Sequence, residues 1–217
     1  MESIEQKRTR VVKIIAILKK THPDAKLALD FKNPLELLIA LILAAQCRDD
    51  LVNTVTPPLF KKYKTAGDWS KANPATLQEE IRKITFYRNK TKSIIKATNM
   101  LVEQFGGKVP DNLEELLTVP GVGRKTANVL LGNAYGIPGI GVDRHVARVS
   151  GRLGLTKNED PDKIEADLTP IVPLKEQTKF CHLLQYHGRR ICVARVPKCP
   201  ECPVNELCFY PDKTKGF

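Results

Sequence analysis

Residues 117–127 read Leu117-Thr-Val-Pro-Gly121-Val-Gly123-Arg-Lys125-Thr-Ala127, a segment with the features of a tight turn between two helices. Two glycines separated by one residue allow a tight turn and leave consecutive backbone N–H groups free at the start of the next helix. Such a helix N-terminus binds a phosphate oxygen, because the helix dipole adds partial positive charge there. We therefore predict a short helix ending at Thr118, a phosphate-binding turn, and a second helix from Thr126 to about Tyr135.

Two other glycine-rich phosphate-binding motifs do not fit this stretch. A dinucleotide-binding fingerprint needs a preceding strand and a third glycine, where the sequence has Thr126. A P-loop needs glycine directly before the lysine, and Arg124 occupies that position. Read alone, the stretch leaves an ordinary glycine-containing helical corner as the alternative.

Helix signals dominate the rest of the chain, and the sequence shows no convincing β-hairpin and no alternating pattern typical of a β-strand. Asn33-Pro34 and Asn73-Pro74 each place a capping residue before a proline at the first helical position. The helices that we expect run from Ile4 to Lys20, from Pro34 through Ile42, from Pro74 through Ile84, from Asn89 to Phe105, from a capping box at Asp111 to Thr118, from Pro161 through Leu168 and from Leu174 to His187. The prediction is an all-α protein.

The net charge of +11 over 217 residues favours a polyanionic partner. Residues 82–96 hold six basic side chains and residues 179–198 hold five, in both cases without an acid. A solvated basic surface is the alternative reading of charge alone. The N-terminus has no apolar signal-peptide core, and no apolar run is long enough to span a bilayer. We expect a cytoplasmic protein that is neither secreted nor bound to membranes.

Four of the six cysteines crowd into the C-terminal segment with intervals of six, two and five residues: Cys192, Cys199, Cys202 and Cys208. In a reducing compartment this pattern indicates a metal site rather than disulfides. Four thiolates can hold zinc or an iron–sulfur cluster. The spacing favours the cluster, because only Cys199 and Cys202 form the close pair that zinc sites usually repeat. The other two cysteines, Cys47 and Cys181, are expected to be buried.

The residues Val119 to Ala127 resemble the helix–hairpin–helix of the endonuclease III family of DNA glycosylases. Eighteen residues after Lys125, the segment Gly141-Val-Asp143-Arg-His-Val146 is similar to the one that carries the family's essential aspartate. The resemblance implies a bifunctional enzyme that removes damaged pyrimidines from double-stranded DNA and cleaves the abasic strand. Lys125 would be its nucleophile, with Asp143 as the catalytic carboxylate.

The same resemblance implies roles for residues elsewhere in the chain. The cysteine spacing matches the family's [4Fe–4S] loop, beside which Arg190 would bind phosphate. Gln46 would fill the gap left by the flipped nucleotide, and Phe86 would wedge into the opposite strand unless it is a core residue. Backbone and side-chain contacts to DNA would come from Gly121, Gly123 and Arg124. Asp49 would help to shape the base pocket, and His145 would be a structural partner of Asp143.

The resemblance also implies two helical domains that flank a DNA-binding cleft in a monomer. One is a helical bundle of residues 27–137, and the other joins residues 1–26 to residues 138–217 and carries the cluster. Thr85, Arg144 and the pair Cys47-Arg48 depart from the common pattern, which bears on substrate preference.

Two rival functions stay open on sequence. A monofunctional mismatch glycosylase, acting on adenine or thymine opposite guanine or its oxidised form, is disfavoured because such relatives commonly lack the lysine. A non-catalytic DNA-binding iron–sulfur protein would leave the Lys125 and Asp143 pairing unexplained.

Overall fold

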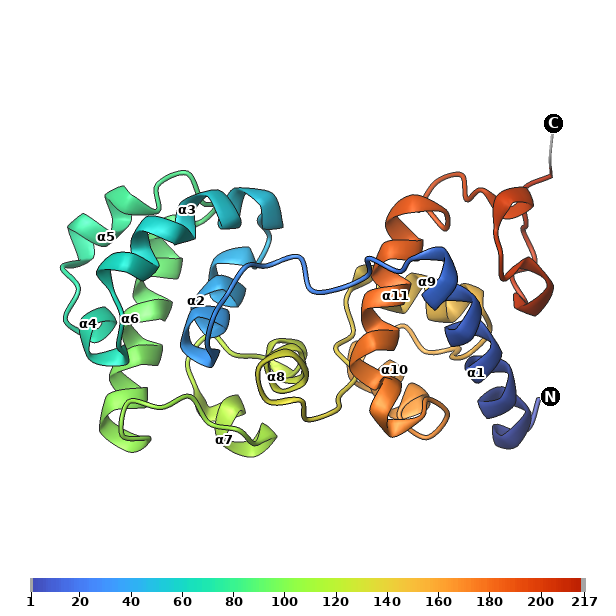
Figure 1. The fold of residues 1–217 in the computed structure, drawn as a ribbon, viewed down its shortest axis with the longest axis horizontal. Coiled ribbons are helices and arrows are strands. Elements are labelled where there is room, and N and C mark those ends of the chain that lie inside the picture. The colour runs from blue at the N-terminus through green and yellow to red at the C-terminus, as the bar shows by residue number, and fades with distance from the viewer. Residues whose placement is uncertain (1, 216–217) are drawn as a thin grey trace. The chain divides into compact units, whose positions relative to one another are not determined.

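The computed structural model describes residues 2–215. Within this range the helices are joined by turns and loops, and there is no β-strand (Figure 1). Two compact units divide the chain. The continuous unit is Leu27–Ile137, and the discontinuous unit joins Met1–Lys26 to Pro138–Phe217. Each unit has a hydrophobic core of its own. No helix within the described residues is long and apolar enough to cross a membrane.

The continuous unit is a bundle built around α6. Its helices are α2 (Pro34–Ala44), α3 (Asp49–Lys62), α4 (Ala66–Ser70), α5 (Pro74–Glu80), α6 (Tyr87–Gln104), α7 (Leu113–Thr118) and α8 (Arg124–Leu130), followed by a π-helical turn (Leu131–Tyr135). The helices α2, α4 and α5 all pack against α6, while α7 and α8 pack against each other. Trp69 and the apolar face of α2 are fully buried in this core.

Asparagine caps begin three of these helices. The side chains of Asn33 and Asn73 accept backbone N–H groups at the starts of α2 and α5, as their sequence predicts. The cap of α7 is Asn112 rather than Asp111, because the Asn112 side chain accepts the N–H of Glu115. The capping-box prediction was therefore wrong by one residue.

Several elements differ from the predicted helices. The helices α3, α4 and α9 were not predicted, and α3 contains Pro57 and Pro58. The helix predicted from Pro74 through Ile84 ends at Glu80. The helix predicted up to Tyr135 is α-helical only to Leu130 and ends in the π-helical turn. A short 3₁₀ turn, Leu174–Glu176, precedes the helix predicted from Leu174.

The discontinuous unit packs the start of the chain against its end. Its helices are α1 (Ile4–Thr21), α9 (Arg144–Arg152), α10 (Pro161–Leu168) and α11 (Gln177–Arg190), with 3₁₀ turns at Cys199–Glu201 and Asn205–Leu207. The helix α11 packs against both α1 and α9. Val204, from the C-terminal loop, is buried in the same core, so the loop is part of this unit's packing.

Candidate active site and cysteine loop

The hairpin between α7 and α8 depends on its two glycines in different ways. Gly121 has a φ of +85°, a conformation that L side chains rarely adopt, and a Cβ there would lie 3.4 Å from the Cβ of Ser93. Gly123 has an ordinary φ of −95° and caps α8, and a Cβ there would meet no atom within 4 Å. Gly121 therefore shapes the turn, whereas Gly123 keeps the space outside the helix N-terminus open.

Lys125 and Arg124 lie on the exposed first turn of α8. The neighbouring Val122 and Ala127 are buried and anchor the turn to the core of the continuous unit. The backbone N–H of Ala127 bonds the Gly123 carbonyl at 2.9 Å, so the helix begins directly at the glycine. A lysine near the N-terminus of a helix lies close to its unpaired N–H groups, where an anion such as a phosphate would bind.

Asp143 is the N-cap of α9. Its Oδ1 accepts the backbone N–H groups of His145 and Val146, each at 2.8 Å, and the side chain is half-buried. Both bonds use the same oxygen, so the cap fixes the orientation of the carboxylate through one of its two atoms. A carboxylate at a helix N-terminus is also stabilised by the helix dipole.

His145 is held as a neutral side chain behind Asp143. Its Nδ1 lies 3.2 Å from Nη2 of Arg148, which also donates to the Gly188 carbonyl at 2.8 Å. Burial lowers the pKa of His145, and the nearby Asp143 only partly opposes this. Arg148 can only donate, so Nδ1 accepts and the imidazole proton is on Nε2. These contacts fit the structural role expected of His145.

Gln46 and Phe86 share an unusual backbone conformation. With φ values of 54° and 57°, they are the two non-glycine residues in the described chain that have positive φ. Gln46 is exposed, and Phe86 is 59% exposed, so the alternative that Phe86 belongs to the core is wrong.

Asp49, predicted to shape a base pocket, begins α3 and is half-buried. Cys47 is half-buried rather than buried as predicted, whereas Cys181 is buried.

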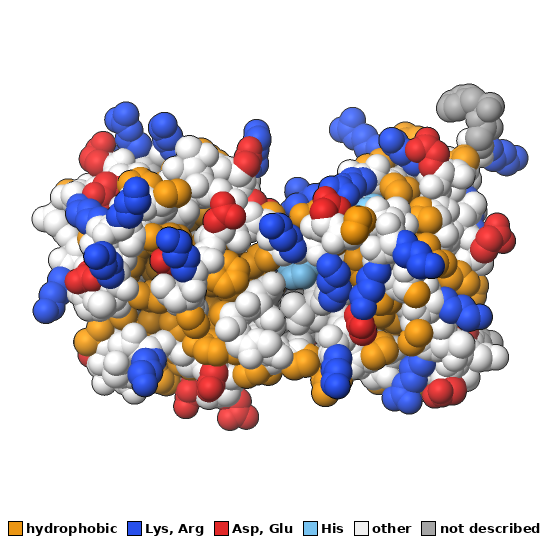
Figure 2. All heavy atoms as spheres, in the orientation of Figure 1, with side chains coloured by type: hydrophobic (Ala, Val, Ile, Leu, Met, Phe, Trp, Pro, Cys, Tyr) orange, Lys and Arg blue, Asp and Glu red, His pale blue; other side chains and the backbone are white. Residues whose placement is uncertain are grey.

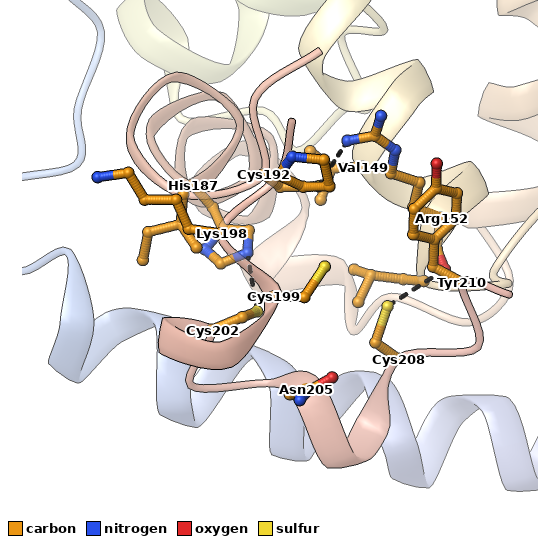
Figure 3. Close-up of a pocket in the computed structure, with 13 residues that line it drawn as sticks. Val149, Arg152, His187, Cys192, Lys198, Cys199, Cys202, Asn205, Cys208 and Tyr210 are labelled. Atoms are coloured by element: carbon orange, nitrogen blue, oxygen red, sulfur yellow. Dashed lines mark hydrogen bonds between the residues drawn. The ribbon is translucent and has the colours of Figure 1, made fainter. Parts of the chain in front are cut away.

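The four C-terminal cysteines line one hollow in the discontinuous unit (Figure 3). Cys192 follows α11, and Cys199, Cys202 and Cys208 lie on or beside the two 3₁₀ turns. No disulfide joins any of the six cysteines, all of which lie among the described residues. The other lining residues include Arg152, His187, Lys198 and Tyr210.

Positive and donor groups surround the sulfur atoms. Nη1 of Arg152 lies 3.4 Å from Sγ of Cys192, and the same guanidinium donates to the Val193 carbonyl at 2.7 Å. Nε2 of His187 lies 3.5 Å from Sγ of Cys202 (Figure 3). Burial raises the pKa of the Cys202 thiol to about 11, so a bound cation would be needed to keep this thiolate inside the hollow.

The donors around the hollow can be compared with the two metal sites that the spacing left open. Zinc needs its sulfur ligands about 2.3 Å from one point. Within residues 2–215, no group of three or more His, Cys, Asp or Glu side chains is placed to hold a single metal ion. Four sulfurs spread around a hollow, next to a guanidinium, fit a larger anionic group better than they fit a single ion.

The basic side chains near the cysteine loop differ in how freely they could bind an anion. Arg190 makes a two-pronged ion pair with Asp24, at 2.9 and 2.6 Å, and its guanidinium lies 4.7 Å from the ring centre of Tyr186. Arg195 is exposed on the loop. Lys and Arg side chains are scattered over the visible face of each unit, with Asp and Glu side chains and apolar areas between them (Figure 2).

Comparisons of the sequence with known proteins all match DNA-repair proteins. The family model described as HhH-GPD superfamily base excision DNA repair protein matches residues 39–173. The chain is 46% identical over 209 residues to endonuclease III of Synechocystis sp., covering 96% of this chain and 95% of that protein. It is 36% identical over 206 residues to endonuclease III of Escherichia coli, covering 95% and 98% respectively.

Solved structures give the same result. The chain is similar to the protein in a trapped endonuclease III–DNA covalent intermediate, with a TM-score of 0.87 and 42% identity, covering 93% of this chain and 95% of that one. A thermostable thymine-DNA glycosylase also matches, with a TM-score of 0.85, covering 95% of this chain and 97% of that one. At 23% identity, this second likeness concerns the fold alone.

Proposed function

The chain belongs to the endonuclease III family of base-excision DNA glycosylases and AP lyases, and we propose that Lys125 and Asp143 perform its two reactions. The observation that supports this proposal most directly is that both residues lie at the N-termini of helices. Lys125 lies on the exposed first turn of α8, and Asp143 caps α9. The two units are the two domains of the enzyme. The continuous one carries the hairpin, and the discontinuous one carries Asp143 and the cysteine loop.

The chemistry follows from these two groups. When the glycosidic bond breaks, the base leaves with the bonding electrons and positive charge develops on the sugar, which the Asp143 carboxylate stabilises. The lone pair of the Lys125 amine forms a bond to C1′ and, after ring opening and proton loss, an imine. The imine acidifies the C2′ proton. Its removal expels the 3′ phosphate by β-elimination and cleaves the strand.

The hairpin holds the DNA during this reaction together with Gln46 and Phe86, two exposed non-glycine residues with a left-handed backbone, which we call the elbows. The open N-terminus at Gly123, with Arg124 beside it and Gly121 shaping the turn, binds a backbone phosphate. Gln46 fills the gap left by the extruded nucleotide, and Phe86 wedges into the opposite strand. The exposure of Phe86 supports this role, since an apolar wedge has to be available at the surface.

A [4Fe–4S] cluster is the group that Cys192, Cys199, Cys202 and Cys208 would hold. It would supply an architectural link that fixes the C-terminal loop, and the basic residues near that loop would then meet DNA phosphates. Two N–H groups of Arg190 already bond Asp24, so it offers fewer free donors to a phosphate than the exposed Arg195. The substrates are oxidised pyrimidines in duplex DNA, on which the protein acts as a cytoplasmic monomer.

Borohydride trapping tests the proposal directly. Wild type and Lys125→Gln are incubated with a duplex that contains one thymine glycol, and the imine is reduced to a stable adduct. We expect an adduct with wild type alone, and complete loss of strand cleavage in the variant. Lys108→Gln, which removes another lysine of the same unit, is the matched control and should trap normally.

Two outcomes would contradict the proposal. Strand cleavage by Lys125→Gln would exclude Lys125 as the nucleophile. Absence of any adduct with wild type that still binds the duplex would favour a mismatch glycosylase, and mismatched duplexes would then be the substrates to assay.

A further inference from the structure

Lys90 is a buried cation that the proposed reaction does not use. Its side chain is 6% exposed, although it lies on α6 between the exposed Asn89 and Lys92. Lysine is rarely buried to this extent without a partner, because removing an ammonium group from water is costly. A role for Lys90 therefore has to come from what its ammonium group contacts.

The ammonium group binds the C-terminal end of another helix. Nζ of Lys90 donates to the Leu43 carbonyl at 2.6 Å, in the last turn of α2. Carbonyls in a last helical turn lack an intrahelical donor, and the helix dipole places partial negative charge there. Burial lowers the pKa of Lys90, while the nearby Cys47 acts in the opposite direction. Lys90 thus caps α2 from the neighbouring helix α6, against which α2 packs.

The two helix ends that Lys90 joins are the ones that carry the exposed elbows. Gln46, with its φ of 54°, lies three residues after Leu43. Phe86, with its φ of 57°, is the N-cap of α6, and its carbonyl accepts the backbone N–H of Lys90 at 3.1 Å. Neither position has a glycine, the residue that adopts the left-handed conformation without strain. Such a conformation persists only where the surrounding structure holds it.

We infer that Lys90 is a positioning residue, whose bond to the Leu43 carbonyl fixes the spacing of Gln46 and Phe86 for their joint insertion into DNA. The inference rests on the proposed roles of Gln46 and Phe86 in the duplex. It assigns Lys90 no contact with DNA and no part in proton transfer. Its loss should therefore impair base extrusion from a duplex while leaving reaction at an already exposed sugar intact.

Lys90→Met tests this role, because it keeps the length of the side chain and removes the donor. Insertion is followed by the fluorescence of 2-aminopurine placed beside a tetrahydrofuran abasic analogue, which brightens when the base unstacks. We expect the fluorescence rise to fall at least fivefold, and single-turnover excision of thymine glycol to slow about tenfold. Borohydride trapping on a single-stranded abasic oligonucleotide should stay within twofold of wild type.

Three further variants make the result specific. Lys96→Met removes an exposed lysine from the same helix and should behave as wild type in every assay. Lys90→Arg keeps a donor and should recover most of the fluorescence rise. If Lys90→Met does not fold, as judged by its melting curve, Lys90→Gln takes its place, since its amide can donate but is too short to reach the same carbonyl.

The controls separate this inference from the function on which it rests. If Gln46→Ala and Phe86→Ala leave the 2-aminopurine signal unchanged, the roles proposed for these two residues fail. If both abolish the signal while folded Lys90→Met or Lys90→Gln behaves as wild type, only the inference about Lys90 is overturned. An equal loss on single-stranded and duplex substrates would likewise contradict it, because a general structural defect would then explain the result.

Discussion

At the scale of single residues, the two hairpin glycines should give opposite results when replaced by alanine. Gly121→Ala imposes a positive φ on a side chain and brings its Cβ within 3.4 Å of Ser93. The left-handed conformation alone costs about 1–2 kcal/mol. A loss of 1 kcal/mol lowers the melting temperature of a protein of this size by about 2–4 °C. Thermal melting of the holoprotein should show this loss.

Gly123→Ala is the matched case, because its backbone is ordinary and its surroundings are empty. Its melting temperature should fall by less than that of Gly121→Ala, because alanine is a poorer N-cap than glycine but its backbone is unstrained. Its Cβ would occupy the space at the helix N-terminus where we place a phosphate, so affinity for undamaged duplex should fall about tenfold, the equivalent of about 1.4 kcal/mol. Unchanged affinity in a fluorescence-anisotropy titration would remove the phosphate from this position.

At the scale of helices, Asp143 combines a structural role with a proposed catalytic one, and two substitutions separate them. Asparagine can still accept N–H groups with its side-chain oxygen, whereas alanine loses the cap of α9 at a cost of about 1 kcal/mol. We expect Asp143→Asn to melt like wild type, and single-turnover excision of thymine glycol to be slower by a factor of about 10²–10³. Asp143→Ala should show the same rate and a lower melting temperature.

The comparison between these two variants decides the role of the charge. Excision at the wild-type rate by Asp143→Asn would mean that the cap, not the negative charge, is what the reaction needs. A melting temperature of Asp143→Ala equal to that of wild type would instead mean that the bonds to His145 and Val146 add little stability.

The elements that the sequence predicts best are those with strong local signals. Caps such as Asn33 and Asp160 mark α2 and α10 because the side chain bonds its own helix. The helix α3 has no such cap, and Pro57 and Pro58 lie inside it, each of which removes a backbone bond at a typical cost of about 3 kcal/mol. Burial of residues such as Val52 and Leu59 offsets that cost, and packing of this kind is not visible in a local pattern.

The candidate site shows the same division between local and non-local information. The hairpin, Lys125 and the cysteine spacing can be read from contiguous residues. The left-handed backbone at Gln46 and Phe86 cannot, because neither residue type favours it, and neither can the bond from Lys90 to a carbonyl 47 residues earlier. The ion pair of Arg190 with Asp24 is equally non-local, so counting charges along the sequence does not reveal it.

At the scale of the whole molecule, the two separate cores predict two different responses to loss of the cysteine-held group. Arg152 binds the loop backbone at Val193, and Val204 is buried in the core of the discontinuous unit. We expect Cys199→Ala, or removal of iron by chelation, to increase amide hydrogen exchange throughout α9 and α11. The helices α2 and α6 belong to the other core and should keep their protection.

Hydrogen exchange followed by mass spectrometry resolves these helices individually. Cys47→Ala removes a thiol from the continuous unit and serves as the control, with no change expected in α9 or α11. Equal deprotection of both units after loss of the cysteines would mean that the two cores unfold as one.

The discontinuous unit also has a consequence for how the protein is made. Its first helix, α1, precedes the continuous unit in the chain, yet it packs against α11, which follows that unit. The continuous unit can fold as soon as residue 137 has emerged, since domains generally fold as units during synthesis. Lys125 is then displayed on a finished scaffold while Asp143 still belongs to an unfinished one. In a nascent chain, the residue that we propose as the nucleophile would therefore reach its folded position before the carboxylate that we propose to assist cleavage of the glycosidic bond.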